Sequence, residues 1–420
     1  MASTRQDHDI DLLIKEFNSY WDTPCRVIIQ NMQSGNPLAF NHFQDLINLE
    51  RQEDIIFIKQ YHDYLQEKIK SNNVATTYAL EFLGSYYYYV VYDYSRAQVY
   101  LELAAKQDSS IAKFILAFMF IHGQYVPITN NIRSGDSDRM DQLGRSLLAE
   151  AVNKDVPQAL MLQSDICGRD IRNLEIHRSW DFSDPVLEEK IAALMQESRA
   201  AYSKASELGL SKAMLRLYGY NKHEKKDDQS ALENLYRAIR FGSSMALSIL
   251  GNLLLQGDDV NARQAITCFQ LAGDKGHAES SGIAGVIFQE GRYATKADLG
   301  MAKKYYLQAI KAWRGEAGGW PETSFRSIQE IYKAHAEWDI LANFYFDIIM
   351  RGVNYIAQGR SRKHYPIFSN SLSGLAELYN AHPNNQRCLS NIIELNEHSW
   401  RSIKTKLHYE LEEKISHYRG

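Results

Sequence analysis

The chain has 420 residues, of which 45% are apolar and 23% charged, and this composition excludes intrinsic disorder, a collagen-like structure and a pure coiled coil as descriptions of the whole chain. Only eight prolines occur, which predicts an almost entirely helical protein. The net charge of −4 and the sequence pI near 6.4 provide no basic field, so nucleic acid is not expected as a ligand.

Residues 1–74 are predicted to be an N-terminal helical region. Apolar side chains recur there at helical intervals, as in Leu12, Phe17 and Trp21. Charged residues interrupt the first 21 positions where a signal peptide needs an apolar run, and no window elsewhere offers the roughly 20 apolar residues of a membrane span. The four cysteines form no C-x-x-C pair, which fits a reduced, cytoplasmic location. Secretion without a cleaved signal stays open.

A run of tyrosines follows Gly84, consisting of Tyr86, Tyr87, Tyr88, Tyr89, Tyr92 and Tyr94. Consecutive side chains point around a helix, so we expect some of these rings to be buried and others to be exposed. Exposed tyrosines are enriched at protein interfaces. Tyr86, Tyr88 and Tyr92 are therefore candidate partner contacts, and packing between helices is the alternative.

The middle of the chain, residues 75–320, contains a recurring block. Its anchors lie 47, 54, 33, 34 and 37 residues apart, at Ala97, Gly144, Ser198, Ala231, Ala265 and Ala302. Seven residues beyond every anchor stands alanine, and four residues beyond stands a large apolar side chain. These positions share one helical face, so the alanine lets a neighbouring helix approach while the bulky side chain fills the remaining space. The block predicts a helix that stacks against its own copies.

Each block continues with a turn and a second helix. The turn is marked eleven residues beyond the anchors by Asp108, Asp155, Gly209, Gly242, Gly276 and Trp313. Glycine suits the left-handed conformation that ends many helices, and aspartate adopts it less readily. A small residue then opens the second helix, most clearly in residues 246–251. Each block therefore predicts an antiparallel helix pair.

The two longest spacings imply insertions, which we place at residues 126–142 and 168–185. The first is polar and rich in turn-forming residues, and the second carries aromatic and basic side chains. Both are predicted to be surface loops. Because repeat arrays often place insertions on a binding edge, Arg178 and Trp180 are candidate contacts. Tolerated variation in loop length is the alternative.

These blocks resemble the Sel-1-like repeats, relatives of the tetratricopeptide repeats, and the resemblance implies a bacterial protein. The clearest copy carries the resemblance in Ala265, Phe269, Ala272, Gly276, His277, Ala278, Gly285 and Gly291. The match departs from the family pattern at Gln163 and Ser164, where leucine and glycine would be expected. The predicted fold is all-α: a right-handed α/α superhelix, or solenoid, of about seven helix-turn-helix repeats with a helical N-terminal region and C-terminal capping helices.

Residues 321–420 are predicted to hold a degenerate repeat and a C-terminal helical cap. The degenerate repeat is read in Leu341, Tyr345 and Ile348, with Gly352 at its turn. Farther on, apolar residues share one face of residues 400–415. Such a helix would cover the last apolar face of the array. A helix that binds a partner is the alternative.

The sequence contains no recognisable catalytic motif. It has no G-x-x-x-x-G-K-[ST] loop, no H-E-x-x-H and no G-x-S-x-G. The C-terminal histidines are 10 and 9 residues apart, not at the spacing of a metal-binding pair, and Cys268 is predicted to be a buried thiol. We therefore expect a non-enzymatic protein with no cofactor and no metal.

A repeat array without catalytic groups predicts a scaffold that binds another protein. Its second helices should line a concave face with side chains 14 and 21 positions beyond the anchors. These candidate contacts are Phe118, Asp165, Lys212, Asn252 and Glu279. The Sel-1-like resemblance implies an adaptor, and the preferred hypothesis is an immunity or inhibitor protein that occludes a toxin or enzyme. The alternatives are a secreted bacterial effector or adaptor that binds a host or signalling protein, and an enzyme with a site in the terminal regions.

Overall fold

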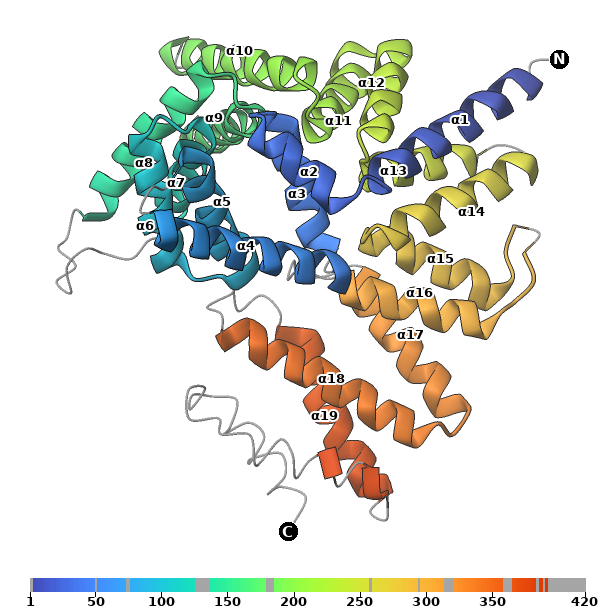
Figure 1. Cartoon of the computed structure of the whole chain (residues 1–420). Coiled ribbons are helices and arrows are strands. Elements are labelled where there is room, and N and C mark those ends of the chain that lie inside the picture. The colour runs from blue at the N-terminus through green and yellow to red at the C-terminus, as the bar shows by residue number, and fades with distance from the viewer. Residues whose placement is uncertain are drawn as a thin grey trace. The chain divides into compact units, whose positions relative to one another are not determined.

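The described part of the chain is entirely helical. The computed structural model describes residues 3–49, 51–72, 76–124, 136–178, 185–256, 259–293, 295–312, 320–357, 365–382, 385–387 and 390–391, and these contain no strand. The chain divides into two compact units, Met1–Ala246 and Leu247–Gly420, shown in Figure 1. Each unit is described by itself below.

Unit 1 starts with helices that precede the repeats: α1 (Ser3–Trp21), α2 (Cys25–Gln33), α3 (Pro37–Leu49), α4 (Gln52–Asn72) and α5 (Thr77–Tyr86). A π-helical turn, η1 (Tyr87–Val91), leads into the pairs α6 (Tyr94–Lys106) and α7 (Ser110–Ile121), α8 (Asp136–Asn153) and α9 (Pro157–Arg178), and α10 (Pro185–Glu207) and α11 (Ser211–Tyr220). A second π-helical turn, η2 (Asn221–Lys225), precedes α12 (Asp228–Arg240) and α13 (Ser244–Leu254), which continues into unit 2.

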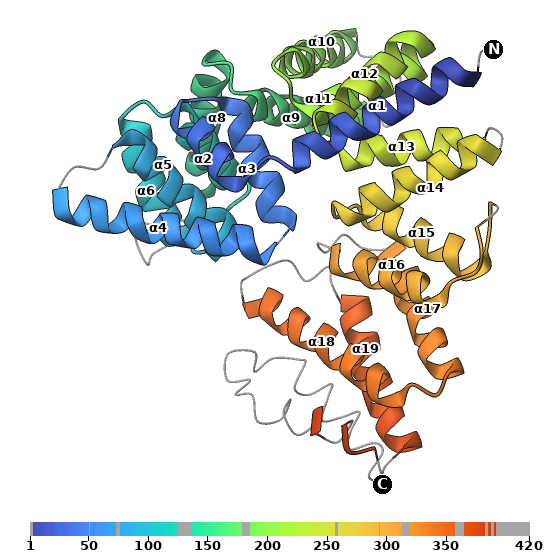
Figure 2. The ribbon, with the colours of Figure 1, turned by 45° about the vertical axis from the view of Figure 1, so that its right-hand side comes forward.

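Unit 2 continues the same arrangement of helix pairs. Its pairs are α14 (Asp259–Asp274) and α15 (Ala278–Glu290), α16 (Leu299–Ala312) and α17 (Trp320–Ala334), and α18 (Trp338–Ala357) and α19 (Tyr365–Ala381). Figure 2 shows α14, α15 and α16 stacked one after another. The prediction of an all-α repeat fold is confirmed.

The repeat positions form the core, as the block pattern predicts. The alanines seven residues beyond the anchors are all fully buried: Ala104, Ala151, Ala205, Ala238, Ala272 and Ala309. Small residues that open the second helices are also fully buried, in Ala112, Ala159, Ala213, Ala246 and Ser280. Because all of these side chains are fully buried, enlarging any of them by even one methylene would disturb the close packing of the helices.

Small residues on one helix face bulky residues on the next. A Cβ on Gly84 of α5 would lie 2.6 Å from Leu101 Cγ of α6, and one on Gly285 of α15 would lie 2.5 Å from the ring of Tyr306 on α16. At Ser164, where the repeat pattern expects glycine, a polar contact takes the place of the contact between a small and a bulky residue. Ser164 of α9 is almost fully buried and its Oγ lies 2.9 Å from Ser198 Oγ of α10.

The turns inside the helix pairs adopt the predicted left-handed conformation. The φ angles are 65° at Asp108, 58° at Asp155, 92° at Gly209, 75° at Gly242 and 83° at Gly276. Trp313 lies outside the described residues. Aspartate at two of these turns confirms that a short polar side chain can take the place of glycine there.

Two local predictions are wrong in part. Helix α8 already begins at Asp136 and α9 continues to Arg178, so much of both predicted loops is helical. The helix predicted from Leu12, Phe17 and Trp21 is α1, in which Leu12 is 51% exposed while Phe17 and Trp21 are buried. Gly352 lies within α18 and ends no helix. The predicted helix at residues 400–415 lies outside the described residues.

Candidate functional site

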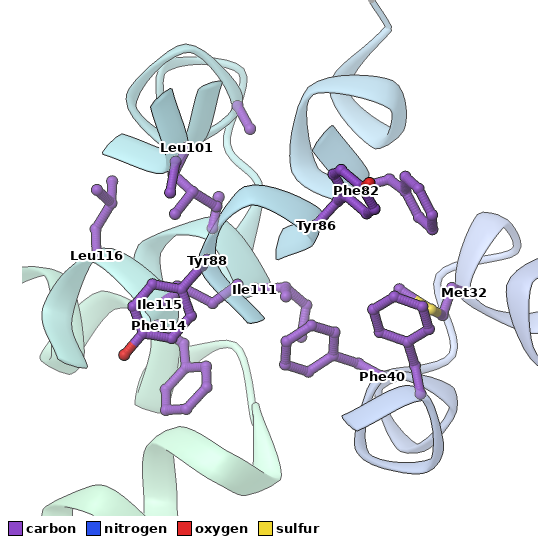
Figure 3. Close-up of a cluster of buried hydrophobic side chains, with 14 of the residues drawn as sticks. Met32, Phe40, Phe82, Tyr86, Tyr88, Leu101, Ile111, Phe114, Ile115 and Leu116 are labelled. Atoms are coloured by element: carbon purple, nitrogen blue, oxygen red, sulfur yellow. The ribbon is translucent and has the colours of Figure 1, made fainter. Parts of the chain in front are cut away.

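The tyrosine run forms η1 and is mostly buried in unit 1. Tyr86, Tyr87 and Tyr88 are each 7% exposed. The Tyr87 ring stacks on Tyr100 at 5.5 Å, and the Tyr88 hydroxyl donates a hydrogen bond to Gln124 Oε1 at 2.5 Å. Figure 3 shows Tyr86 and Tyr88 in a cluster with Met32, Phe40, Phe82 and Phe114. Tyr86 and Tyr88 therefore pack between helices, while Tyr92 is partly exposed.

Helices that precede the repeats cover this turn. The ring of Tyr89 packs edge-on against Phe40 of α3 at 6.0 Å. On α4, His62 Nε2 lies 3.2 Å from the Tyr87 hydroxyl, and Gln66 Nε2 donates to the same hydroxyl at 3.4 Å. The hydroxyls of Tyr87 and Tyr88 are thus satisfied within the unit, as buried polar groups require.

The same π-helical turn recurs at η2, 134 residues later (221 − 87), with different side chains. In both copies the sixth residue is left-handed, Tyr92 in one and Lys226 in the other. The next residue is an aspartate that caps the following helix: Asp93 accepts from Arg96 N–H and Asp227 from Ser230 N–H. The η2 copy carries exposed charged residues from 224 to 226 instead of buried aromatic ones. Such π-helical segments frequently occur at functional sites.

Helices α1 and α3 run along the turns of the helix pairs in unit 1. Gln158, at the start of α9, donates from Nε2 to Pro37 O at 3.4 Å. A Cβ on Gly209, at the next turn, would lie 2.9 Å from Leu38 of α3. At the turn after that, the Trp21 indole donates to Gly242 O at 3.0 Å. The N-terminal helices therefore occupy this edge of the unit.

A buried polar cluster lies where α1 meets α3. The Tyr20 ring stacks on His42 at 3.9 Å, and its hydroxyl donates to Asp45 Oδ2 at 2.8 Å. Burial raises the pKa of the Asp45 carboxyl to about 6, although the Tyr20 hydrogen bond opposes this, and burial lowers the pKa of His42 to about 4. A cavity of about 450 Å³ beside the cluster is lined by Tyr20 and His42, with Glu16 and Arg240 among its other residues. The sequence contained no local signal for this cluster.

The predicted contacts on the second helices of unit 1 are partly or fully exposed. Asp165 of α9 accepts from Arg216 Nη2 of α11 at 2.5 Å and lies 3.9 Å from Lys212 Nζ. The structure thus brings Asp165 and Lys212 together and adds Arg216, which the sequence pattern missed. Phe118 of α7 is partly buried and its ring stacks on His122 at 4.0 Å.

The remaining predicted contacts are not gathered into this group. Asn252 on α13 and Glu279 on α15 are exposed residues of unit 2. Arg178 is the last residue of α9, and its side chain lies outside the described part of the chain, as does Trp180. The partner contacts are therefore best sought first around Asp165 and Lys212.

Reactive groups in the described residues are buried or dispersed. Cys25, Cys167 and Cys268 are buried free thiols, and burial raises the pKa of Cys268 to about 12. Across the parts of the chain that the structure describes, no three His, Cys, Asp or Glu side chains gather as metal ligands would. No helix among those described is both long and apolar enough to cross a membrane. The reactive side chains that the structure describes therefore point to no catalytic or metal site. The exposed helix faces are the candidate binding surface.

Stacked helix pairs with buried small residues at fixed positions define an α-helical repeat fold. No protein-family model matches the sequence, and no curated protein matches it. Among solved structures, the chain is similar to a Sel1 repeat protein from Oxalobacter formigenes, at 19% identity and a TM-score of 0.45 over 63% of this chain and 100% of that one.

Two other solved structures are similar to the chain. One is a protective antigen with an SLR fold from uropathogenic Escherichia coli, at 14% identity and a TM-score of 0.33 over 98% of this chain and 83% of that one. The other is an immunity protein from Pseudomonas aeruginosa, at 15% identity and a TM-score of 0.35 over 52% of this chain and 74% of that one.

Proposed function

We propose that the chain is a non-enzymatic, protein-binding repeat scaffold that acts as an immunity or inhibitor protein, occluding a cognate toxin or enzyme. The observation that carries the proposal is that the second helices of the pairs have two kinds of position, one buried and one on the surface. Their small residues are buried without exception in the described copies, while charged residues such as Asp165, Lys212 and Arg216 reach the surface. A repeat array with a constant core and a variable outer face is suited to recognising another protein.

The experiment that tests the proposal starts from the full chain as bait in its native organism. The captured protein is identified, produced separately and mixed with the purified chain, and its own activity is measured against increasing amounts of the chain. An immunity or inhibitor role predicts that activity falls to zero at a one-to-one ratio. The double variant Lys212→Glu/Arg216→Glu should weaken binding, because it reverses two surface charges while leaving the buried alanines intact.

A matched control distinguishes this surface from general effects of charge. Lys59→Glu/Lys70→Glu reverses two exposed charges on α4, away from α9 and α11. A captured protein that binds both variants equally well would move the site elsewhere on the chain. A captured protein that binds but keeps full activity would favour the adaptor or effector alternative. Failure to reconstitute any direct complex would refute the proposal.

A further inference from the structure

We propose that the partner contributes an acidic protein segment that docks on a basic surface of unit 1. This α9–α11 surface consists of Arg169 and Arg172 on α9, Lys212 and Arg216 on α11, and Lys225 at the end of η2. The inference rests on the proposed function, because it names the chemistry of the partner at the surface where that function places it. It does not depend on whether the partner is a toxin.

Helices α9 and α11 start side by side and run in the same direction. Gln158 at the start of α9 contacts Pro37, and the turn just before α11, at Gly209, contacts Leu38, the next residue of α3. Asp165, about two helical turns into α9, then reaches Lys212 and Arg216 on α11. The helices therefore approach each other at two levels along their axes, first where both starts contact α3 and then where Asp165 reaches α11.

The register of the two helices brings the five cations onto one face. Arg169 and Arg172 follow Asp165 by four and seven residues, so all three share a face of α9. Seven residues correspond to a rise of about 10 Å along an α-helix. The same rise from the level of Arg216 on α11 reaches η2, where Lys225 lies over the Tyr220 ring at 5.4 Å. The basic surface therefore extends along both helices.

Among the residues that the structure describes, the carboxylates on this surface neutralise only a part of its positive charge. Lys212 and Arg216 share the single carboxylate of Asp165, with side chains 69% and 50% exposed. Arg169 and Arg172 form no ion pair with any residue that the structure describes. Five cations outnumber the two carboxylates among them, Asp165 and Glu224, in a chain whose net charge is −4. A field of this sign attracts a negatively charged partner and speeds its association.

The distribution of charge favours protein carboxylates over nucleic acid. Arginine side chains form paired hydrogen bonds with single carboxylates, and three of the five cations are arginines. Nucleic-acid binding instead requires neutralisation of a continuous row of phosphates. Here Asp165 within the surface and the exposed Glu224 in η2 interrupt the positive field and would repel such a row. Separate acidic side chains on a protein segment can fit between these two carboxylates.

The test measures binding of a fluorescein-labelled peptide of about 20 residues, in which single glutamates are separated by pairs of neutral residues, to the full chain by fluorescence anisotropy. We expect binding that weakens as salt rises, because exposed charges are screened. Arg169→Glu/Arg172→Glu should raise the dissociation constant by about tenfold or more, while the control Lys59→Glu/Lys70→Glu should change it by less than about twofold. Far-ultraviolet circular dichroism of each variant should match that of the unmodified chain.

Two results would overturn the inference. One is binding of the peptide that is unaffected by Arg169→Glu/Arg172→Glu, or no binding at all. The other is single-stranded DNA of about 20 nucleotides binding as tightly as the peptide and losing affinity in the same variant, which would assign the surface to nucleic acid. Neither result bears on the reconstitution with a captured protein. Failure of the acidic-segment inference can therefore be told apart from failure of the protein-binding proposal.

Discussion

Replacing Asp45 by asparagine should stabilise unit 1 at neutral pH and change little near pH 4. The carboxyl of Asp45 is buried against α1 and accepts a hydrogen bond from the Tyr20 hydroxyl at 2.8 Å. Its pKa rises from 3.8 to about 6, mainly because burial penalises the charged form. Asparagine retains an oxygen acceptor for Tyr20 and carries no charge, so the variant removes only the electrostatic penalty.

The magnitude follows from the difference between the folded and unfolded pKa values. At about 1.4 kcal/mol per pKa unit, a rise from 3.8 to about 6 corresponds to about 3 kcal/mol. A group whose folded pKa is raised stabilises the fold below its unfolded pKa and loses that contribution as pH rises through its folded pKa. Asp45 therefore favours folding below pH 4 and ceases to do so above about pH 6. Asp45→Asn should exceed the unmodified chain in free energy of unfolding by about 3 kcal/mol at pH 7.

His42 opposes Asp45 over the same pH interval. Its pKa falls from 6.5 to about 4 on burial, so its contribution is present above pH 6.5 and is lost as pH falls through about 4. Between about pH 4 and pH 6 the folded state holds an extra proton on Asp45, and the unfolded state holds one on His42. The two slopes cancel in the unmodified chain. In Asp45→Asn only the His42 contribution is left, so the free energy of unfolding should rise by about 1.4 kcal/mol per pH unit across this interval.

Urea unfolding at a series of pH values measures these slopes, since urea does not screen charge. Hydrogen exchange in α1 and α3 should report the same trend locally, because Tyr20, His42 and Asp45 join these two helices. His42→Gln should give the opposite slope, with stability falling as pH rises from 4 to 6. Curves for Asp45→Asn that run parallel to those of the unmodified chain across this interval would refute the reasoning. A double variant that is as flat as the unmodified chain is the control for additivity.

Three packing predictions follow from the same structure. Gly285→Ala should destabilise unit 2 by about 1–3 kcal/mol, since its Cβ would lie 2.5 Å from a tyrosine ring. The control is Gly219→Ala, whose Cβ would have no atom within 4 Å and which should stabilise the chain by about 0.5–1 kcal/mol. If urea unfolding finds Gly285→Ala as stable as Gly219→Ala, the close contact at Gly285 is contradicted. Gly242→Ala should increase hydrogen exchange in α1, because a left-handed alanine costs about 1–2 kcal/mol and its Cβ would meet the Tyr20 ring. A double-mutant cycle of Ser164→Ala and Ser198→Ala should give a coupling of about 0.5–1.5 kcal/mol, and a value near zero would argue against their hydrogen bond.

The repeat fold could be predicted from the sequence because its contacts recur at short, regular separations. An alanine seven residues beyond each anchor and a glycine or aspartate at each turn are local signals, and the structure places both as expected. The predicted loops failed for a local reason as well. Residues 136–142 belong to the start of α8, where Arg145 pairs with Asp141 at 2.8 Å, and a largely polar helix segment has the composition of a loop.

The surroundings of the tyrosine run could not be predicted from local pattern. Tyr87 and Tyr89 are covered by His62 and Phe40, on helices that precede the repeats and carry none of their signature. The equivalent turn at η2 has the same backbone and exposes charged side chains instead. One backbone motif thus serves packing in one copy and surface charge in another. Which role a copy takes depends on contacts between residues far apart in sequence.

The position of α1 and α3 limits where a partner can bind on unit 1. These helices occupy the edge formed by the turns at Gly209 and Gly242, through contacts whose members are up to 224 residues apart in sequence. A partner that used this edge would have to displace Trp21 from its buried site and separate the Tyr20 hydroxyl from Asp45. The outer faces of α9 and α11 need no such rearrangement. Binding there keeps the N-terminal helices in place, so a pre-formed surface can recognise an acidic segment without first unfolding part of the unit.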